Sequence, residues 1–111
     1  MLQIEGPFEG VENKRYQMHA LAETKINFQN VFQRVSRYHA KVPRDVALEL
    51  YALYKQANHG NVAGKRPLAL FFMQRAKYDA WFAKEDMSCL EAMQTYIHLA
   101  EAWVMSFIRA V

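Results

Sequence analysis

The sequence predicts an all-α fold, a bundle of four helices preceded by an N-terminal arm. Only 4 Gly and 3 Pro occur in 111 residues, so turns are few and the helices between them are long. Apolar residues also recur at helical spacing in separate segments of the chain. Hydrophobic residues make up 52% of the chain and charged residues 23%, which excludes an intrinsically disordered protein. A chain of this length is typical of one domain; we place it at residues 24–111, with residues 1–23 as the arm.

The N-terminal arm and the first helix differ in their periodicity. Residues 1–23 show a weak pattern and contain Gly6, Pro7 and Gly10, which predicts an extended or loosely ordered segment. From Thr24 a helical pattern begins. Its apolar residues share one helix face: Phe28, Val31, Phe32, Val35 and Tyr38. Residues 39–42 then form a short connection, and Pro43 suits the first turn of the next helix.

The second helix is expected over residues 43–58, ending near Gly60. Its core stripe has 4-3-4 spacing and consists of Val46, Leu50, Leu53 and Ala57. Another side of the helix carries Leu48, Tyr51, Tyr54, Lys55 and Asn58. Residues three or four apart are neighbours on a helix surface. Two tyrosines and a lysine therefore cluster outside the core stripe.

Residues 59–71 are expected to form a long loop, because they include His59, Gly60, Gly64 and Pro67. Loops of this length are uncommon in compact domains and are often functional. The third helix is predicted over residues 72–84, with Trp81 in the core. The fourth opens at Ser88, where Glu91 completes a capping box. Its apolar stripe is Met93, Tyr96, Ile97, Ala100, Val104 and Phe107.

Composition limits the classes of function. The net charge of +3 is too small for a typical duplex-DNA binder but fits a small anionic ligand. Cys89 is the only cysteine, which excludes an internal disulfide and favours a reducing, cytoplasmic compartment. We expect neither a secretory signal nor a transmembrane helix. The histidines lack metal-ligand spacing and the glycines form no phosphate-binding loop, so no metal, cofactor or enzyme activity is predicted, although a pair of Cys89 with a distant histidine stays open.

The segment Leu50–Gly60, LYALYKQANHG, closely resembles the second helix of acyl-CoA-binding proteins. The resemblance continues through KRP at residues 65–67 and AKYDAW at residues 76–81. In the fourth helix it rests on Ser88, Ala92, Met93, Tyr96 and Ile97. It covers roughly residues 28–100, and the combined motifs are specific.

This resemblance implies an up-down-down-up four-helix bundle whose long crossover joins the second and third helices. It also implies non-covalent binding of long-chain acyl-CoA thioesters by a carrier of fatty acid metabolism that does not transform its ligand. The residues that match the family's main ligand contacts are Tyr51, Tyr54, Lys55, Lys77 and Tyr96. Phe32, where a small residue is common near the acyl groove, and Leu48 complete the predicted site.

The chemistry of these residues agrees with such a ligand. CoA carries a 3′-phosphate and a diphosphate, which Lys55 and Tyr51 can bind from adjacent positions. Tyr54 is expected to stack on adenine, and Lys77 and Tyr96 to close the head-group site from other helices. The acyl chain contributes about 0.8 kcal/mol per buried methylene, so long chains should dominate the affinity and free CoA should bind far more weakly.

Ser36, Phe32, Met73 and Tyr78 depart from the family pattern, and the first two bear on the predicted site. Ser36 stands where many members have a basic residue near the 3′-phosphate, and Arg34 and Arg37 are candidates to replace it. The bulk of Phe32 is expected to shorten or redirect the acyl groove.

The alternative function is a helical protein–protein interaction module that has lost acyl-CoA binding; nucleic-acid binding is a third, less favoured class. The apolar C-terminal run, residues 103–111, either packs against the N-terminal arm or forms a dimer or partner surface. We favour a monomer over a dimer.

Overall fold

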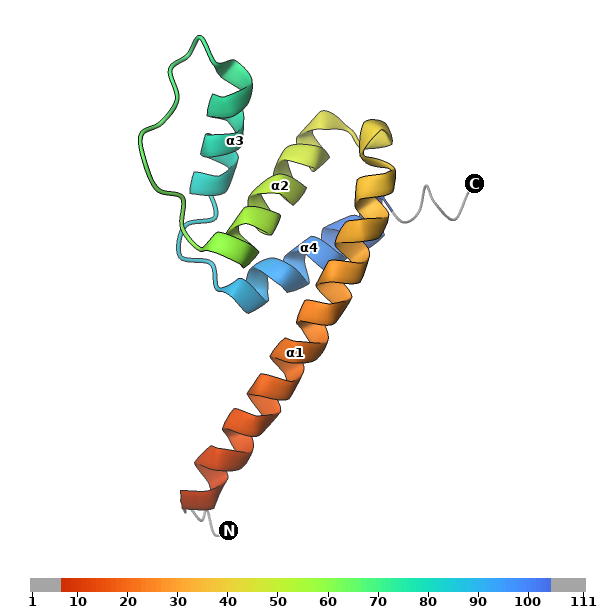
Figure 1. The fold of residues 1–111 in the computed structure, drawn as a ribbon, viewed down its shortest axis with the longest axis vertical. Helices are drawn as coiled ribbons and strands as arrows, with labels where there is room; N and C mark the ends of the chain where they lie inside the picture. The colour runs from red at the N-terminus through yellow and green to blue at the C-terminus, as the bar shows by residue number, and fades with distance from the viewer. Residues whose placement is uncertain (1–6, 105–111) are drawn as a thin grey trace.

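The computed structural model describes the backbone of residues 7–104 and the side chains of residues 14–104. Its elements are α1 (Pro7–Arg37), the short 3-10 helix η1 (His39–Lys41), α2 (Arg44–His59), α3 (Phe72–Phe82) and α4 (Cys89–Trp103) (Figure 1). The described residues contain no strand. The prediction of an all-α fold with four helices is therefore confirmed.

The helices follow the expected up-down-down-up path. In Figure 1, α2 and α3 run in the same direction, and the crossover of residues 60–71 returns the chain from the end of α2 to the start of α3. Helix α2 packs against α3 and α4, and α1 packs against α4. None of the described helices is long and apolar enough to span a membrane.

Helix α1 begins much earlier than the sequence pattern indicated. The expected extended arm is wrong from residue 7 onward, because the helix starts at Pro7 rather than at Thr24. Proline suits the first position of a helix, and residues 11–27 contain neither Gly nor Pro. At a rise of about 1.5 Å per residue, α1 is roughly 46 Å long. Its N-terminal half extends beyond the other helices (Figure 1).

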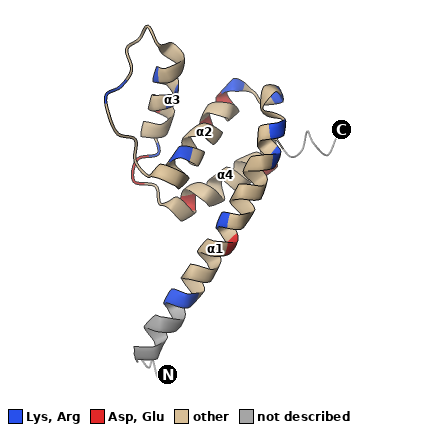
Figure 2. Cartoon of the chain, in the orientation of Figure 1, with Lys and Arg blue, Asp and Glu red and all other residues tan. Residues whose placement is uncertain are grey.

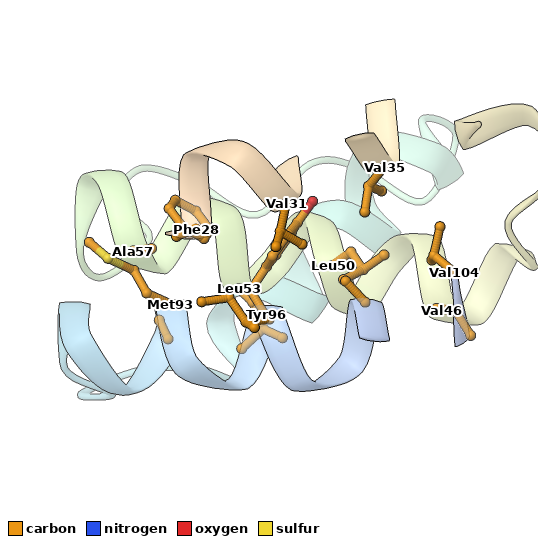
Figure 3. Packing of buried hydrophobic residues seen from close by; sticks show 13 residues of the cluster. Phe28, Val31, Val35, Val46, Leu50, Leu53, Ala57, Met93, Tyr96 and Val104 are labelled. Carbon is orange, nitrogen blue, oxygen red and sulfur yellow. The ribbon is translucent and has the colours of Figure 1, made fainter. Parts of the chain in front are cut away.

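The core lies where α1, α2 and α4 meet (Figure 3). Each of these helices supplies most of the stripe that the sequence predicted. The buried members include Phe28, Val31, Val35, Val46, Leu50, Leu53, Ala57, Met93, Tyr96, Ile97, Ala100 and Val104. Phe32 and Tyr38 are only half-buried, since they flank the stripe of α1. Phe107 and most of the apolar C-terminal run lie outside the described residues.

Local signals set the ends of the shorter helices. Ser88 caps α4, and its Oγ accepts a hydrogen bond of 3.1 Å from the backbone N–H of Glu91, as the capping box predicted. Such a cap is typically worth about 1 kcal/mol. Helix α2 starts one residue after Pro43 and ends at His59, directly before Gly60, whose φ of 73° favours glycine. Helix α3 ends at Phe82, two residues earlier than expected.

The side chain of Gln56, the one buried polar residue of the described core, fixes the position of α3. Its Nε2 donates to Oδ1 of Asn61 at 2.9 Å and to the carbonyl of Met87 at 3.0 Å. Its Oε1 accepts from Nε1 of Trp81 at 3.1 Å, and the same indole N–H lies 2.8 Å from the carbonyl of Gly60. Trp81 is half-exposed and does not belong to the core. Its side chain instead holds α3 against the end of α2.

Two further contacts hold the crossover on α3. Arg66 donates to both carboxylate oxygens of Asp79, at 2.7 and 2.6 Å. This hydrogen-bonded pair raises the pKa of Arg66 and lowers that of Asp79. The hydroxyl of Tyr78 donates to the carbonyl of Gly64 at 2.9 Å. The long loop is therefore an ordered part of the bundle.

Candidate ligand-binding site

A cavity of about 300 Å³ opens between α1 and α2, with α4 beneath it. The backbones of α1 and α2 approach each other at few points, because each packs mainly against α4. Side chains therefore line the space between them. The lining residues are Phe32, Val35, Ser36, His39, Val42, Ala47, Leu50, Tyr51, Tyr54, Lys55 and Tyr96. Most of them are aliphatic or aromatic, so the cavity suits an apolar ligand segment.

Aromatic rings form one wall of this cavity. Phe32 stacks on Tyr54 with ring centroids 4.3 Å apart and planes at 19°. Phe28 lies beneath, 5.0 Å from the ring of Tyr96 in an edge-on arrangement. Tyr96 is only 2% exposed, and burial raises the pKa of its phenol, with a smaller contribution from Tyr54. The phenol of Tyr96 is therefore held neutral inside the bundle.

A polar rim adjoins the cavity and consists of Tyr51, Lys55 and Lys77. The ammonium nitrogen of Lys55 lies 5.8 Å from the ring centroid of Tyr51 and 5.6 Å from that of Trp81. The ammonium nitrogen of Lys77, which comes from α3, lies 5.3 Å from the same Tyr51 ring. No acidic side chain among the described residues forms a salt bridge with either lysine. Two unneutralised cations around one aromatic ring form a suitable site for an anionic group.

The structure brings most of the predicted site residues together. Five of them line the cavity: Phe32, Tyr51, Tyr54, Lys55 and Tyr96. Lys77 lies at the rim through its contact with Tyr51. Leu48 is half-buried and does not line the cavity. Tyr96 lies at the buried base of the cavity, and one face of Tyr54 is occupied by Phe32.

The region around Ser36 differs from the expected compensation by a neighbouring arginine. The Oγ of Ser36 donates to the carbonyl of Phe32 at 2.8 Å, while Arg34 and Arg37 do not line the cavity. His39 does line it, with Nδ1 3.0 Å from the carbonyl oxygen of Ser36. Sequence reasoning missed His39 because it lies in a connection, where helical periodicity gives no signal.

Two observations concern metal ligands and the single thiol in the part of the chain that is described. No group of three or more His, Cys, Asp or Glu residues there is arranged to hold a metal ion. The thiol of Cys89 donates to the carbonyl of Ala57 at 3.0 Å, at the start of α4.

The family model for acyl CoA binding protein matches residues 25–100. The chain belongs to the acyl-CoA-binding protein family. This assignment confirms the resemblance carried by Leu50–Gly60 and by the motifs of α3 and α4. The matched residues include both the cavity and the polar rim.

Two known proteins are similar to this chain in sequence. An acyl-CoA-binding protein of Brassica napus is 41% identical over 73 residues, which is 66% of this chain and 79% of that protein. Enoyl-CoA delta isomerase 2 of Rattus norvegicus is 34% identical over 83 residues, or 75% of this chain. The match spans only 21% of the rat protein, so this chain corresponds to about a fifth of that relative.

A solved structure has the same arrangement of helices. The crystal structure of Oryza sativa acyl-CoA-binding protein 2 aligns with a TM-score of 0.61 and 32% sequence identity. The alignment covers 76% of this chain and 98% of the rice chain. The four-helix bundle of this chain therefore has the acyl-CoA-binding protein fold.

Proposed function

We propose that this protein binds acyl-CoA thioesters non-covalently, with the acyl chain in the cavity and the nucleotide head at the polar rim. The observation that carries the proposal is the junction of an apolar cavity with two lysines around Tyr51. An acyl-CoA has the same division, because its chain is apolar and its head carries several phosphate charges. Membership of the family supports the same ligand.

The phosphates of CoA are assigned to Lys55 and Lys77. These lysines come from different helices, so together they can contact two phosphate groups or hold one from two sides. A hydrogen bond to a charged group contributes about 1.5–3 kcal/mol. Tyr51 is the better partner for adenine, since Phe32 already stacks on Tyr54; such stacking is worth about 1–3 kcal/mol.

The acyl chain is assigned to the cavity between α1 and α2, over the ring of Tyr96. Each buried methylene contributes about 0.8 kcal/mol, so long-chain thioesters are the preferred ligands. The stacked pair of Phe32 and Tyr54 limits the groove on one side. We expect affinity to rise with chain length and to level off by C18, and Phe32→Ala to let it rise further. An unbroken increase through C20 in the unaltered protein would remove this role of Phe32.

We further propose that the ligand is carried unchanged by a monomer in the cytoplasm. Residues 24–111 form the binding domain in this proposal, which agrees with a family match that starts at residue 25. The largely aliphatic and aromatic lining supports storage of an acyl chain. Incubation with palmitoyl-CoA should leave the thioester intact, as followed by chromatography of the CoA released.

A second candidate function is an interaction module that keeps the fold without the ligand. It is favoured by the absence of a basic side chain at Ser36 and by the bulk of Phe32. Isothermal titration calorimetry with palmitoyl-CoA, free CoA and palmitate distinguishes the two. One-to-one binding of palmitoyl-CoA, far tighter than either control, supports the carrier. No heat and no protection against thermal unfolding would favour the interaction module.

A further inference from the structure

Four large apolar side chains are exposed together where the crossover loop enters α3. They are Leu68, Leu70, Phe71 and Phe72, which we call the apolar tip, and their exposed fractions range from 51% to 80%. None of them belongs to the hydrophobic core or lines the cavity. Figure 1 shows that the end of this loop and the start of α3 form an outer corner of the molecule, away from α1 and α4. Clustered exposed apolar side chains commonly mark an interaction surface.

The apolar tip is held in an ordered turn. The N–H of Phe71 donates to the carbonyl of Leu68 at 2.9 Å, and the N–H of Arg75 donates to the carbonyl of Phe71 at 2.9 Å. The next residue, Met73, is contacted through its sulfur by the guanidinium of Arg44, which ties the start of α3 to the start of α2. The tip is therefore presented in a fixed conformation.

The charged residues that flank the apolar tip along the sequence have one sign. Residues 50–78 contain no Asp or Glu, and their five cations are Lys55, Lys65, Arg66, Arg75 and Lys77. Figure 2 shows basic and no acidic residues on the crossover loop. Arg66 is paired with Asp79, but Lys65 on the loop and Arg75 one turn into α3 flank the tip. An apolar surface flanked by cations is complementary to a membrane of anionic lipids.

We propose that the apolar tip docks the protein on an anionic lipid bilayer. Leu68, Leu70 and the two phenylalanines enter the interface between head groups and acyl chains, while Lys65 and Arg75 contact lipid phosphates. A second copy of the chain fits this surface less well, because pairing two tips would bring cations of both copies together. The inference goes beyond the proposed binding of acyl-CoA and does not depend on it.

Docking through the apolar tip would place the polar rim close to the membrane. Lys77 follows Phe72 by five residues on the same helix, about 8 Å along its axis. The rim therefore lies near the surface from which an amphipathic lipid thioester enters water.

Flotation with lipid vesicles tests the docking surface. The whole protein is mixed with vesicles of phosphatidylcholine alone or of phosphatidylcholine with phosphatidylserine. We expect binding to the anionic vesicles that weakens with added salt. Leu68→Ser with Leu70→Ser should lower the partition coefficient at least about tenfold, and Lys65→Glu at least about fivefold. The matched control, Met18→Ser with Ile26→Ser, removes comparably exposed side chains from α1 and should bind as the unaltered protein does.

Each other outcome overturns the proposal. No binding to anionic vesicles, equal binding to neutral ones, or binding unchanged by the leucine substitutions would exclude lipid docking by the tip. A dimer in solution that the leucine substitutions dissociate would assign the tip to a second copy. Calorimetry with palmitoyl-CoA on the leucine variant separates membrane docking from acyl-CoA binding. The affinity of this variant for palmitoyl-CoA should stay unchanged whether or not it binds vesicles.

Discussion

The cavity and the polar rim depend on different parts of the bundle. The cavity is enclosed by α1, α2 and α4, the three helices that share the core, and its base is the buried ring of Tyr96. The rim joins α2 to α3, and α3 contributes no buried residue to that core. The position of α3 relies on polar contacts, above all those of Gln56 and Trp81. In the proposed function, the acyl chain is thus bound beside the helices that form the core, whereas the head group is bound by residues whose position depends on a few hydrogen bonds.

Blocking the cavity should have the largest effect. Ala47 lines the cavity yet is exposed, so Ala47→Trp fills the space without removing a core side chain. Displacing several methylenes, at about 0.8 kcal/mol each, should weaken palmitoyl-CoA binding at least about a hundredfold. Free CoA should bind as before, as measured by calorimetry. Ala22→Trp, on the exposed half of α1, is the matched control. Unchanged affinity for palmitoyl-CoA would mean that the acyl chain binds outside the cavity.

Removing a charge from the rim should have the next largest effect. Lys55→Met keeps the aliphatic stem beside Tyr51 and Trp81 but loses the ammonium group. Loss of a charged contact of about 1.5–3 kcal/mol corresponds to a tenfold to hundredfold weaker affinity. Palmitoyl-CoA and free CoA should be affected equally in calorimetric titrations. Lys25→Met, on the exposed part of α1, should change neither. A loss confined to palmitoyl-CoA would contradict the division between the two regions.

Loosening the support of α3 should affect stability more than affinity. Gln56→Ala leaves polar groups of Asn61 and Met87 without their buried partner. The free energy of unfolding should fall by about 1–3 kcal/mol, as measured by urea unfolding. Affinity for free CoA should fall only a few-fold, since Lys77 is less well placed. Gln74→Ala, exposed on α3, serves as the control. An unaltered unfolding midpoint would show that Gln56 does not hold α3.

The smallest effect is expected from the phenol of Tyr96. Its raised pKa means that the folded protein favours the neutral form, so this stability is present below the unfolded pKa of about 10 and is lost as pH rises above it. Tyr96→Phe should remove that part of the alkaline destabilisation, at up to about 1.4 kcal/mol per pH unit. Urea unfolding between neutral and alkaline pH measures it, with the exposed Tyr16→Phe as control. Identical pH dependence in Tyr96→Phe and the unaltered protein would rule out this role.

Local sequence signals predicted most of the fold. The buried stripes of α2 and α4 and the cap at Ser88 follow from spacing and side-chain chemistry alone. The start of α1 did not, because Gly6, Pro7 and Gly10 indicate a break by type, whereas Pro7 in fact occupies the first helical position. Residues 11–27 contain neither Gly nor Pro, so no further break interrupts the helix that Pro7 begins.

The site was predicted less completely, because it depends on how helices sit against one another. Periodicity placed Tyr51 and Lys55 on one face of α2, and the family resemblance added Lys77 and Tyr96. Neither the periodicity nor the resemblance revealed that Phe32 stacks on Tyr54, or that Leu48 lies outside the cavity lining. Both features depend on the rotation of α2 relative to α1.

In the proposed function, the acyl chain is assigned to the cavity and the head group to the polar rim. Isotope-filtered NMR of the complex with palmitoyl-CoA tests this assignment most directly. Nuclear Overhauser effects should connect the acyl chain to Phe32, Val35 and Tyr96, and the adenine to Tyr51. Acyl contacts confined to Leu70 and Phe71 of the apolar tip, with none in the cavity, would contradict the account.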